Sequence, residues 1–365
     1  MKPLQIAVIG AGHLGRIHAK LLGQVDGVEL VAITDPFAAA REQAKSQFGV
    51  PTFESHRDTL ASIDAAIVSS PTPFHAEIVS ELLAADKHVF VEKPITIDVD
   101  DASNLVKLAA LRRRVLQVGH VERFNPAWIA AAPVTADAKY IEAVRASRFP
   151  GRCLDVGVVL DLMIHDIDLV LSLTDAPLKS VRASGIAVVS DHEDMAEARL
   201  EFECGLVANL KASRISPSPA RQMKTFGPRG FAEIDFGSLA LSTICPAQSI
   251  SQRAFVLEDA TDQPLRFAEE LFSRFLIPEC IKVEPRNAIL DELHDFVISI
   301  QSRTSPTVTG ADGLRAVEVA NLILESIDAR AWSRDAAHRL VGPHAKPLEG
   351  VEAASRRIHD GRRAA

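Results

Sequence analysis

A lysine that precedes a proline is a candidate catalytic residue of this sequence. Lys93 lies in Glu92-Lys93-Pro94, directly after the apolar run 89–91. A residue that precedes proline avoids helical geometry, so we expect Lys93 in an extended chain at the carboxyl edge of a sheet. There its ammonium could hold a substrate hydroxyl and favour the alkoxide. A solvated lysine at a strand end is the alternative interpretation.

A second group of chemical residues lies in a helical pattern that runs from about 156 to 173. Asp161, His165 and Asp168 are spaced at i, i+4 and i+7, which places them on one helix face. Their neighbours are apolar, so these side chains should either pair or line a wet cavity. A carboxylate one turn away would orient His165 as a general base for a hydroxyl proton, and a purely structural Asp-His pair is the alternative. Asp166 lies off this face and is expected to be structural.

Three glycines near the N-terminus predict a phosphate-binding loop. They lie between the apolar run 6–9 and a helix-compatible stretch, which is the context that this motif requires. The first permits a tight turn, the second lets the backbone approach a pyrophosphate, and the third allows close packing of helix on strand. The helix N-terminus then presents free amides to the phosphates. The loop residues expected to bind the cofactor are Gly10, Gly12, His13, Leu14 and Gly15.

An aspartate at the end of the next strand suggests which dinucleotide binds. Asp35 follows Gly15 by 20 residues, where a carboxylate can accept hydrogen bonds from the adenosine ribose hydroxyls. Pro36 and Phe37 come next, so no arginine adjoins Asp35 to receive a 2′-phosphate. We therefore expect NAD rather than NADP, although Arg41 keeps NADP as an alternative. Asp35 could also simply cap the following helix.

The turn after the third strand should line the nicotinamide side of the same crevice. Ser70-Pro71-Thr72-Pro73 precedes His75, and a plain strand-to-helix turn is the alternative interpretation. The residues of this region that we expect near the cofactor are Ser70, Thr72, His75, Glu92 and Lys93.

The elements that carry these residues fall into two patterns. Up to residue 119, short β-branched runs alternate with helical patterns, which predicts a doubly wound parallel sheet. From about residue 140, apolar residues alternate in period two, which favours a large open, mainly antiparallel sheet with one covered face. Two further helices are expected at about 288–302 and 313–330. The fold class is thus α/β, with a Rossmann domain at 1–120, a substrate-binding and oligomerisation domain at 121–332, and a mobile tail or inter-subunit arm at 333–365.

Composition excludes several other classes of protein. The chain has 365 residues, 47% hydrophobic and 24% charged, with a formal net charge of −8 that opposes nucleic-acid binding. Its four cysteines show no disulfide or metal-ligand spacing, so no metal is expected. Neither a signal peptide nor an apolar run long enough for a membrane is evident, and we expect a cytoplasmic protein.

These motifs together resemble the Gfo/Idh/MocA family of oxidoreductases. The resemblance rests on the glycine loop with His18 after it, the turn with His75, the Glu92-Lys93-Pro94 triplet, and Asp161 four residues before His165. It spans roughly residues 5 to 330. The resemblance implies a Rossmann domain followed by an open-sheet domain, often buried in dimers or tetramers. It also implies that Lys93, Asp161 and His165 are the catalytic residues, with His165 as acid and base.

The stretches 118–126 and 159–168 look most like a narrower group, the UDP-N-acetylglucosamine 3-dehydrogenases. That resemblance implies oxidation of the sugar's 3-hydroxyl to a ketone, or the reverse. The diphosphate of such a substrate is negatively charged and would need cations. Arginine suits this role, because its guanidinium binds phosphate oxygens in bidentate fashion. Two alternatives stay open: a free sugar or inositol as substrate, and a non-catalytic regulatory protein that holds the cofactor. The residues that we expect to bind substrate are Arg123, Asn125, Arg148, Arg152 and Arg214. For each of these arginines, a surface or ion-pair role is the alternative interpretation.

Overall fold

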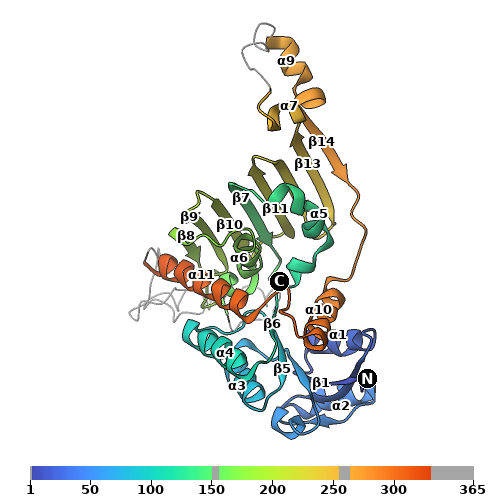
Figure 1. Cartoon of the computed structure of the whole chain (residues 1–365). Coiled ribbons are helices and arrows are strands. Elements are labelled where there is room, and N and C mark those ends of the chain that lie inside the picture. The colour runs from blue at the N-terminus through green and yellow to red at the C-terminus, as the bar shows by residue number, and fades with distance from the viewer. Residues whose placement is uncertain (1, 150–155, 255–263, 330–365) are drawn as a thin grey trace, which may run out of the picture.

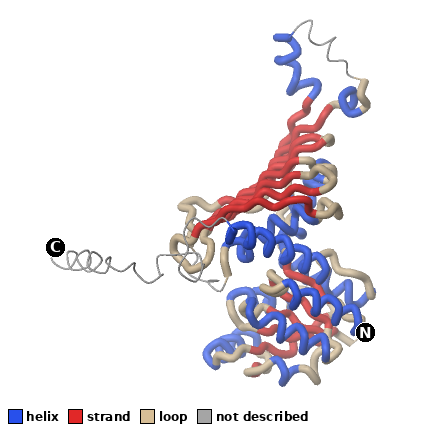
Figure 2. The backbone as a smooth tube through the Cα atoms, turned by 90° about the vertical axis from the view of Figure 1, so that its left-hand side faces the viewer, coloured by secondary structure: helices blue, strands red, loops and turns tan. Residues whose placement is uncertain are grey.

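The computed structural model describes residues 2–149, 156–254 and 264–329, and it contains two sheets with helices between them (Figures 1 and 2). The lower body in Figure 1 holds the N-terminal sheet, and the second sheet lies above it. Arg152 and the expected tail at 333–365 lie outside the described residues. Among the helices that are described, none combines the length and the apolar composition that a bilayer crossing requires.

The N-terminal sheet has six parallel strands in the order β3-β2-β1-β4-β5-β6. This order confirms the predicted doubly wound sheet, whose ligand crevice lies at the carboxyl ends of the strands. The short strand β3, which has only two residues, was not expected. The strands are β1 (Leu4–Ile9), β2 (Val28–Thr34), β3 (Thr52–Phe53), β4 (Ala65–Val68), β5 (His88–Glu92) and β6 (Leu116–Gly119).

Helices cover both faces of this sheet, and one of them comes from far along the chain. Leu293, Phe296 and Val297 of α10 pack into the same buried cluster as Leu22 and Phe90. The N-terminal body therefore includes a helix beyond residue 120, where the sequence-based domain boundary lies. The helices around this sheet are α1 (His13–Leu22), α2 (Ala38–Phe48), α3 (His75–Ala84), α4 (Val99–Arg112), α10 (Ala288–Ser302), α11 (Gly310–Ala329) and the 3-10 turns η1 (His56–Thr59) and η2 (Thr72–Phe74).

The second sheet has eight strands in the order β14-β13-β12-β11-β7-β10-β9-β8. All neighbouring pairs are antiparallel except β7 with β10, so the expectation of a mainly antiparallel sheet is confirmed. The strands are β7 (Tyr140–Ala146), β8 (Leu178–Ile186), β9 (Met195–Phe202), β10 (Val207–Ser213), β11 (Ala220–Gly227), β12 (Gly230–Asp235), β13 (Ala240–Pro246) and β14 (Leu276–Ile281).

One face of this sheet is covered by helices and the other is open. Along β7, Ile141, Ala143 and Arg145 are buried, whereas Glu142 and Val144 point to the exposed side. The alternation arises because successive side chains of a strand point to opposite faces. The covering elements that reach the sheet are α5 (Pro126–Thr135), the π-helical turn η4 (Val159–Met163), α6 (Ile164–Leu171) and α11, with η3 (Val121–Phe124) leading into α5.

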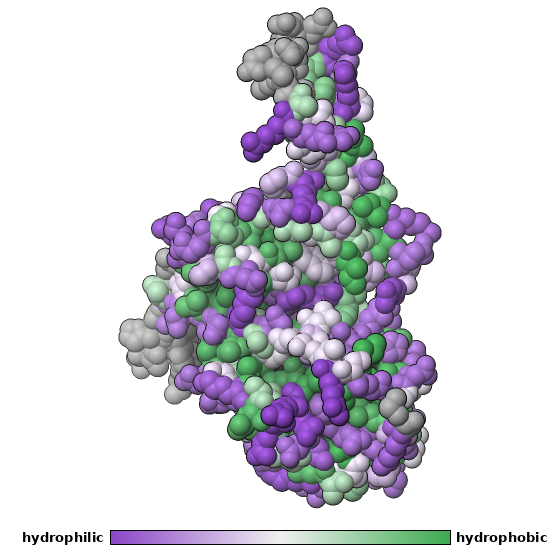
Figure 3. Space-filling view, in the orientation of Figure 1, coloured by the Kyte–Doolittle hydropathy of each residue, from purple (hydrophilic) through white to green (hydrophobic). Residues whose placement is uncertain are grey.

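Strands β13 and β14 extend beyond the sheet into an arm (Figure 1). The arm carries α7 (Gln248–Ser251), α9 (Pro264–Glu270) and η5 (Leu271–Phe275). Leu265 and Phe272 of the arm are 83% and 55% exposed. On the face seen in Figure 3, hydrophobic and hydrophilic residues are otherwise interspersed over both bodies.

Candidate active site

A cleft of about 1200 Å³ lies between the carboxyl edge of the N-terminal sheet and the turn η4. Its floor is the glycine loop, and its sides come from the ends of β2, β4 and β5. Leu160, Asp161 and Leu162 of η4 close it on the side of the second sheet. Most of the expected cofactor residues thus meet Lys93 and Asp161 in one cavity, because parallel strands end at the same edge, whereas His165 is not among its lining residues.

The glycine loop has the geometry that a pyrophosphate needs. Gly10 has φ +99°, and a Cβ there would come within 2.8 Å of the Ser69 carbonyl oxygen. A Cβ on Gly15 would overlap the carbonyl oxygen of Gly10, so helix and strand pack closely only with glycine. A Cβ on Gly12 would meet nothing within 4 Å, and no side chain caps the start of α1. The first amides of α1 are therefore available to an anion.

Asp35 holds the loop from the next strand. Its Oδ2 accepts a hydrogen bond from the Ala11 amide, and its Oδ1 accepts one from the Phe37 amide, both at 2.9 Å. A carboxylate has further lone pairs, so ribose hydroxyls can still donate to it. Arg41 donates to the backbone oxygens of Asp35 and Pro36 at 2.8 and 2.9 Å, which occupies its guanidinium beside this part of the cleft.

The turn after β4 lines the cleft with Ser70, Thr72 and His75. His75 is buried, and its ring nitrogens lie 2.8 Å from the Ser70 carbonyl oxygen and 2.9 Å from that of Pro94. Burial lowers the pKa of His75. His75 therefore ties two cleft-lining turns together, in addition to contributing to the wall of the cleft.

Lys93 and Asp161 meet across the cleft. The Lys93 ammonium donates to the Asp161 backbone oxygen at 2.6 Å and to its Oδ1 at 3.1 Å. Their side chains are 15% and 14% exposed, so the pair is partly shielded from water. The expectation that Asp161 orients His165 is not what the geometry shows, because the Asp161 carboxylate is bound to Lys93.

His165 is partly buried, and within the described part of the chain its Nδ1 has no hydrogen-bond partner. Burial lowers the pKa of His165 well below its ordinary value, and the positive charges of Lys93 and Arg145 lower it further. The imidazole is consequently neutral at physiological pH, which is the form that can accept a proton.

The third member of the expected helix face points elsewhere. Asp168 accepts hydrogen bonds from Arg123 Nε and Nη2 at 2.7 and 3.0 Å. The straight-helix expectation fails because η4 is a π-helical turn, which changes the angular spacing of the residues that follow it. Asp166 pairs with buried Arg145, in agreement with its expected structural role.

The residues expected to bind substrate are not gathered at the cleft. Asn125 is buried, with its Oδ1 accepting from the Ala127 amide at the start of α5. Arg214 is fully buried and pairs with Asp194 at 2.8 Å, which agrees with the ion-pair alternative rather than with its expected role as a substrate ligand. Arg148 is exposed and donates to the Pro217 oxygen at 3.1 Å.

Two basic residues near the site were missed. His120 follows β6 and is 1% exposed, and neither ring nitrogen has a partner among the residues that the structure describes. Because Glu92 pairs with Gly119 in the parallel register, Lys93 and His120 leave the sheet side by side. Arg221, 45% exposed, contacts buried Glu122. The position of His120 at a strand end was a signal that sequence reasoning could have used.

Behind Lys93, a buried acid cluster was also missed. His18 Nε2 lies 2.6 Å from Glu92 Oε1, and a carboxylate oxygen of Glu292 from α10 lies within 4.8 Å of the side chains of both. Burial raises the pKa of Glu292 well above its ordinary value, and the charge of Glu92 adds to the rise. Burial would also raise the pKa of Glu92, but the hydrogen bond from His18 lowers it overall.

The fold and this cleft define a class of protein, the oxidoreductases that bind a nicotinamide dinucleotide on a Rossmann domain. The chain belongs to the Gfo/Idh/MocA family. Residues 4–120 match the family model described as the oxidoreductase family with NAD-binding Rossmann fold, and residues 134–233 match the GFO/IDH/MocA C-terminal domain. The family resemblance and the enzymatic class expected from the sequence are thereby confirmed.

Among characterised relatives, UDP-N-acetylglucosamine 3-dehydrogenase of Acidithiobacillus ferrooxidans is 32% identical over 329 residues, which is 89% of this chain and 98% of that protein. Its solved structure superposes with a TM-score of 0.78, at 31% identity, covering 90% of this chain and 99% of the other. The NAD-dependent scyllo-inositol 2-dehydrogenase of Bacillus subtilis is 30% identical over 236 residues, 59% of this chain and 68% of that protein.

A solved scyllo-inositol dehydrogenase from Lactobacillus casei, with NAD(H) and scyllo-inositol bound, has the same fold. Its TM-score is 0.70 at 23% identity, covering 90% of this chain and 98% of that one.

Proposed function

We propose that this protein oxidises a secondary hydroxyl of a nucleotide sugar, the 3-hydroxyl of UDP-N-acetylglucosamine, or reduces the corresponding ketone. The observation that carries the proposal is the Lys93–Asp161 contact in the cleft. It occurs in a chain that is 32% identical to a UDP-N-acetylglucosamine 3-dehydrogenase. Lys93, Asp161 and His165 are the residues that we assign to the reaction.

NAD is the proposed cofactor, and the described residues fit it. The open side of Gly12 and the uncapped amides of α1 suit the pyrophosphate, and the Asp35 carboxylate suits a ribose with a free 2′-hydroxyl. Arg41 is engaged by backbone oxygens, which favours NAD over NADP. When bound, NAD supplies the acceptor for the hydride that leaves the sugar carbon.

The chain's own residues handle the proton and the charge. The substrate hydroxyl would lie between Lys93 and His165, and neutral His165 takes its proton. As negative charge builds on that oxygen, the Lys93 ammonium stabilises it in a shielded site. Asp161 holds Lys93 in place through its backbone oxygen and its carboxylate. Loss of one proton and one hydride converts the alcohol to a ketone.

The direct test is to mix the protein with NAD and UDP-N-acetylglucosamine and to follow NADH absorbance. Turnover that depends on Lys93 and His165 supports the proposal. Absence of turnover with UDP-N-acetylglucosamine, together with turnover of an inositol or a free sugar, contradicts the proposed substrate.

A free inositol or sugar is the second candidate, and one observation favours it. Two arginines expected to bind a diphosphate are occupied, Arg123 by Asp168 and Arg214 by Asp194. Two described arginines stay accessible to such a charge: Arg148 is exposed, and Arg221 is 45% exposed although it contacts Glu122. If Arg148→Ala and Arg221→Ala raise KM for UDP-N-acetylglucosamine but not for inositol, the nucleotide-sugar assignment is supported.

We further propose that the open face of the second sheet is covered by another copy of the chain, in a homodimer or homotetramer. This face carries both charges and apolar side chains, including Val144 and Phe226, which are 38% and 40% exposed. Light scattering during gel filtration tests the assembly, and a monomer would contradict it. We place the protein in the cytoplasm, since Cys204, Cys245 and Cys280 are free thiols among the described residues.

A further inference from the structure

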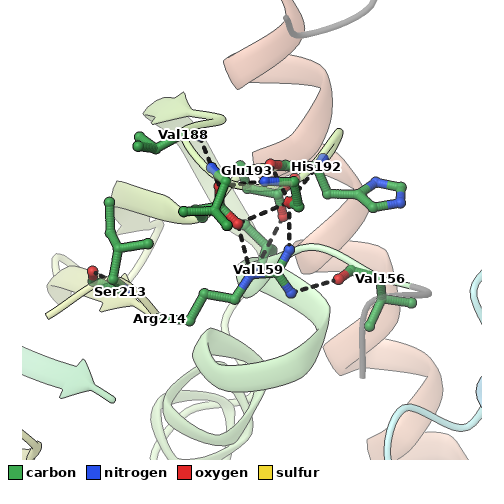
Figure 4. Close-up of polar contacts among 11 residues, drawn as sticks. Val156, Val159, Val188, His192, Glu193, Ser213 and Arg214 are labelled. Carbon is green, nitrogen blue, oxygen red and sulfur yellow. Dashed lines mark hydrogen bonds and ion pairs between the residues drawn. The ribbon is translucent and has the colours of Figure 1, made fainter. Parts of the chain in front are cut away.

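A loop from the far edge of the second sheet is pinned to the start of the turn that carries Asp161 (Figure 4). This loop, residues 187–194, joins β8 to β9. The Glu193 backbone oxygen accepts a hydrogen bond from the Val158 amide at 2.9 Å. Its Oε1 accepts one from the Val159 amide at 3.1 Å. One residue thus binds two amides at the beginning of η4.

These amides have no local cap. The residue before η4 is Val158, whose side chain cannot accept a hydrogen bond, and η4 has no side-chain cap of its own. The first amides of a helix lack partners within it and are costly to bury unsatisfied. Glu193, which is distant in sequence, therefore caps these amides in place of the serine or aspartate that is usual at an N-cap.

The backbone beside η4 is shaped for this carboxylate. Glu193 is 4% exposed and lies against Gly157. A Cβ on residue 157 would overlap the Glu193 carboxylate, so glycine leaves the space that the carboxylate fills. Burial raises the pKa of Glu193, and the Val159 amide opposes that rise. The carboxyl oxygen accepts from the Val159 amide in either protonation state.

The loop that carries Glu193 is itself held by hydrogen bonds to Asp194. Asp194 Oδ2 accepts from the amides of Val188, Val189 and Ser190 at 2.7, 2.6 and 3.0 Å. Its Oδ1 accepts from Arg214 Nε at 2.8 Å, and both side chains are fully buried.

Arg214 extends this network toward the cleft. It donates through Nη1 to the Val156 backbone oxygen at 2.9 Å, and Val156 lines the cleft. Its guanidinium carbon lies 5.6 Å from the centroid of the Phe149 ring. The loop and Arg214 therefore fix the backbone on the approach to η4 as well as its first turn.

The register of η4 decides what Lys93 meets. The Asp161 amide donates to the Gly157 oxygen at 3.0 Å, so the position of Asp161 follows directly from that of Gly157. The Asp161 backbone oxygen is in turn the acceptor 2.6 Å from Lys93. A shift at the start of η4 is transmitted through one hydrogen bond to the Lys93 contact.

We propose that Glu193 is a positioning residue for the reaction, which caps η4 so that Asp161 presents its backbone oxygen and carboxylate to Lys93. The inference rests on the proposed hydride transfer in this cleft. Glu193 does not line the cleft, so it acts through the backbone of η4 rather than by contact with substrate or cofactor.

The test compares Glu193→Ala, which removes the acceptor, with Glu193→Gln, which keeps an oxygen acceptor of the same length. Glu203→Ala, at an exposed position in the turn after β9, is the matched control. Hydrogen exchange measured by mass spectrometry should show faster exchange at the start of η4 in Glu193→Ala, but in neither Glu193→Gln nor the control. A kcat loss on the order of ten- to a hundredfold should accompany it, since small misplacements near the reacting atoms are costly. The Kd of NAD should stay unchanged.

A second variant distinguishes loss of the Glu193 contact from a general folding defect of Glu193→Ala. Gly157→Ala leaves Glu193 in the chain but fills the space of its carboxylate, so it should reproduce the exchange and kcat changes of Glu193→Ala. Wild-type exchange at η4 in Glu193→Ala would overturn the proposal. So would equal impairment of Glu193→Gln and Glu193→Ala. The exchange measurement needs no substrate, so it remains decisive if the wild-type enzyme fails to oxidise UDP-N-acetylglucosamine, a result that would count against the proposed function alone.

Discussion

The ammonium of Lys93 lies 2.6 Å from the backbone oxygen of Asp161 and 3.1 Å from its Oδ1, and thereby joins the end of β5 to η4. Lys93 follows a strand of the N-terminal sheet, whereas Asp161 lies in a turn that packs on the second sheet, and the two residues are 68 positions apart. Both residues line the cleft, so the contact places a positive charge there. Most of the proposed chemistry depends on that placement.

Replacement of Lys93 by methionine should remove this charge and retain the side-chain stem. We expect kcat to fall on the order of a hundredfold or more, because a positioned cation that stabilises developing negative charge contributes that much. The Kd of NAD, measured by fluorescence titration, should change little. Lys107→Met on the exposed side of α4 is the control. Full activity of Lys93→Met would refute the assigned mechanism.

The pH profile should report His165. Its pKa is lowered well below 6.5 by burial, and by nearby positive charges. The proton-accepting form is present above that pKa, so kcat/KM should be level through neutral pH and decline only in the acid range. His165→Asn should lose about 10²–10⁴ in kcat and the acid limb assigned to this residue. An acid limb in wild type centred near 6.5 or above would contradict this assignment.

Asp35→Ser should weaken NAD and reduce discrimination against NADP. The change removes the acceptor for the ribose hydroxyls and also the bond to the Ala11 amide. Hydrogen bonds to a charged group contribute about 1.5–3 kcal/mol, which corresponds to roughly a 10- to 100-fold rise in Kd. Titration with each dinucleotide measures both effects, and Asp26→Ser at an exposed position is the control. Unchanged preference for NAD would show that selectivity lies elsewhere.

Arg214→Met should destabilise the protein, because it leaves Asp194 buried without its guanidinium partner. Breaking a fully buried pair in this way costs about 3–5 kcal/mol. Denaturant unfolding measures the loss, and Arg148→Ala, at an exposed position, should stay within about 0.5 kcal/mol of wild type. A loss below 1 kcal/mol for Arg214→Met, about the value for an exposed ion pair, would contradict the buried pair.

Glu292→Gln should change how stability depends on pH. Burial, reinforced by Glu92, raises the folded-state pKa of Glu292 well above its unfolded value of about 4.3. The unfolded chain therefore releases this proton first as pH rises, so wild type loses up to about 1.4 kcal/mol of stability per pH unit between the two pKa values. Removing the titratable group should flatten this part of the curve. If the free energy of unfolding changes with pH to the same extent in the two proteins across this window, a protonated Glu292 is contradicted.

The sequence by itself determined the local features of the N-terminal domain. Parallel strands and their helices have strong periodicity, and the glycine spacing with Asp35 is set within one βαβ unit, so local rules sufficed. The motifs also identified Lys93 and Asp161 as chemical residues. Short β3 was missed, since two residues carry no period.

Only the tertiary structure decided which of these groups meet. A π-helical turn separates Asp161 from the face expected for Asp168, and no spacing rule anticipates it. The sequence predicts that Arg214 binds substrate, with a surface or ion-pair role as the alternative, yet it is fully buried, where Asp194 compensates its charge. Glu193 and Val159 are joined across 34 positions. Contacts of that kind depend on how the two sheets pack, which lies beyond any local pattern.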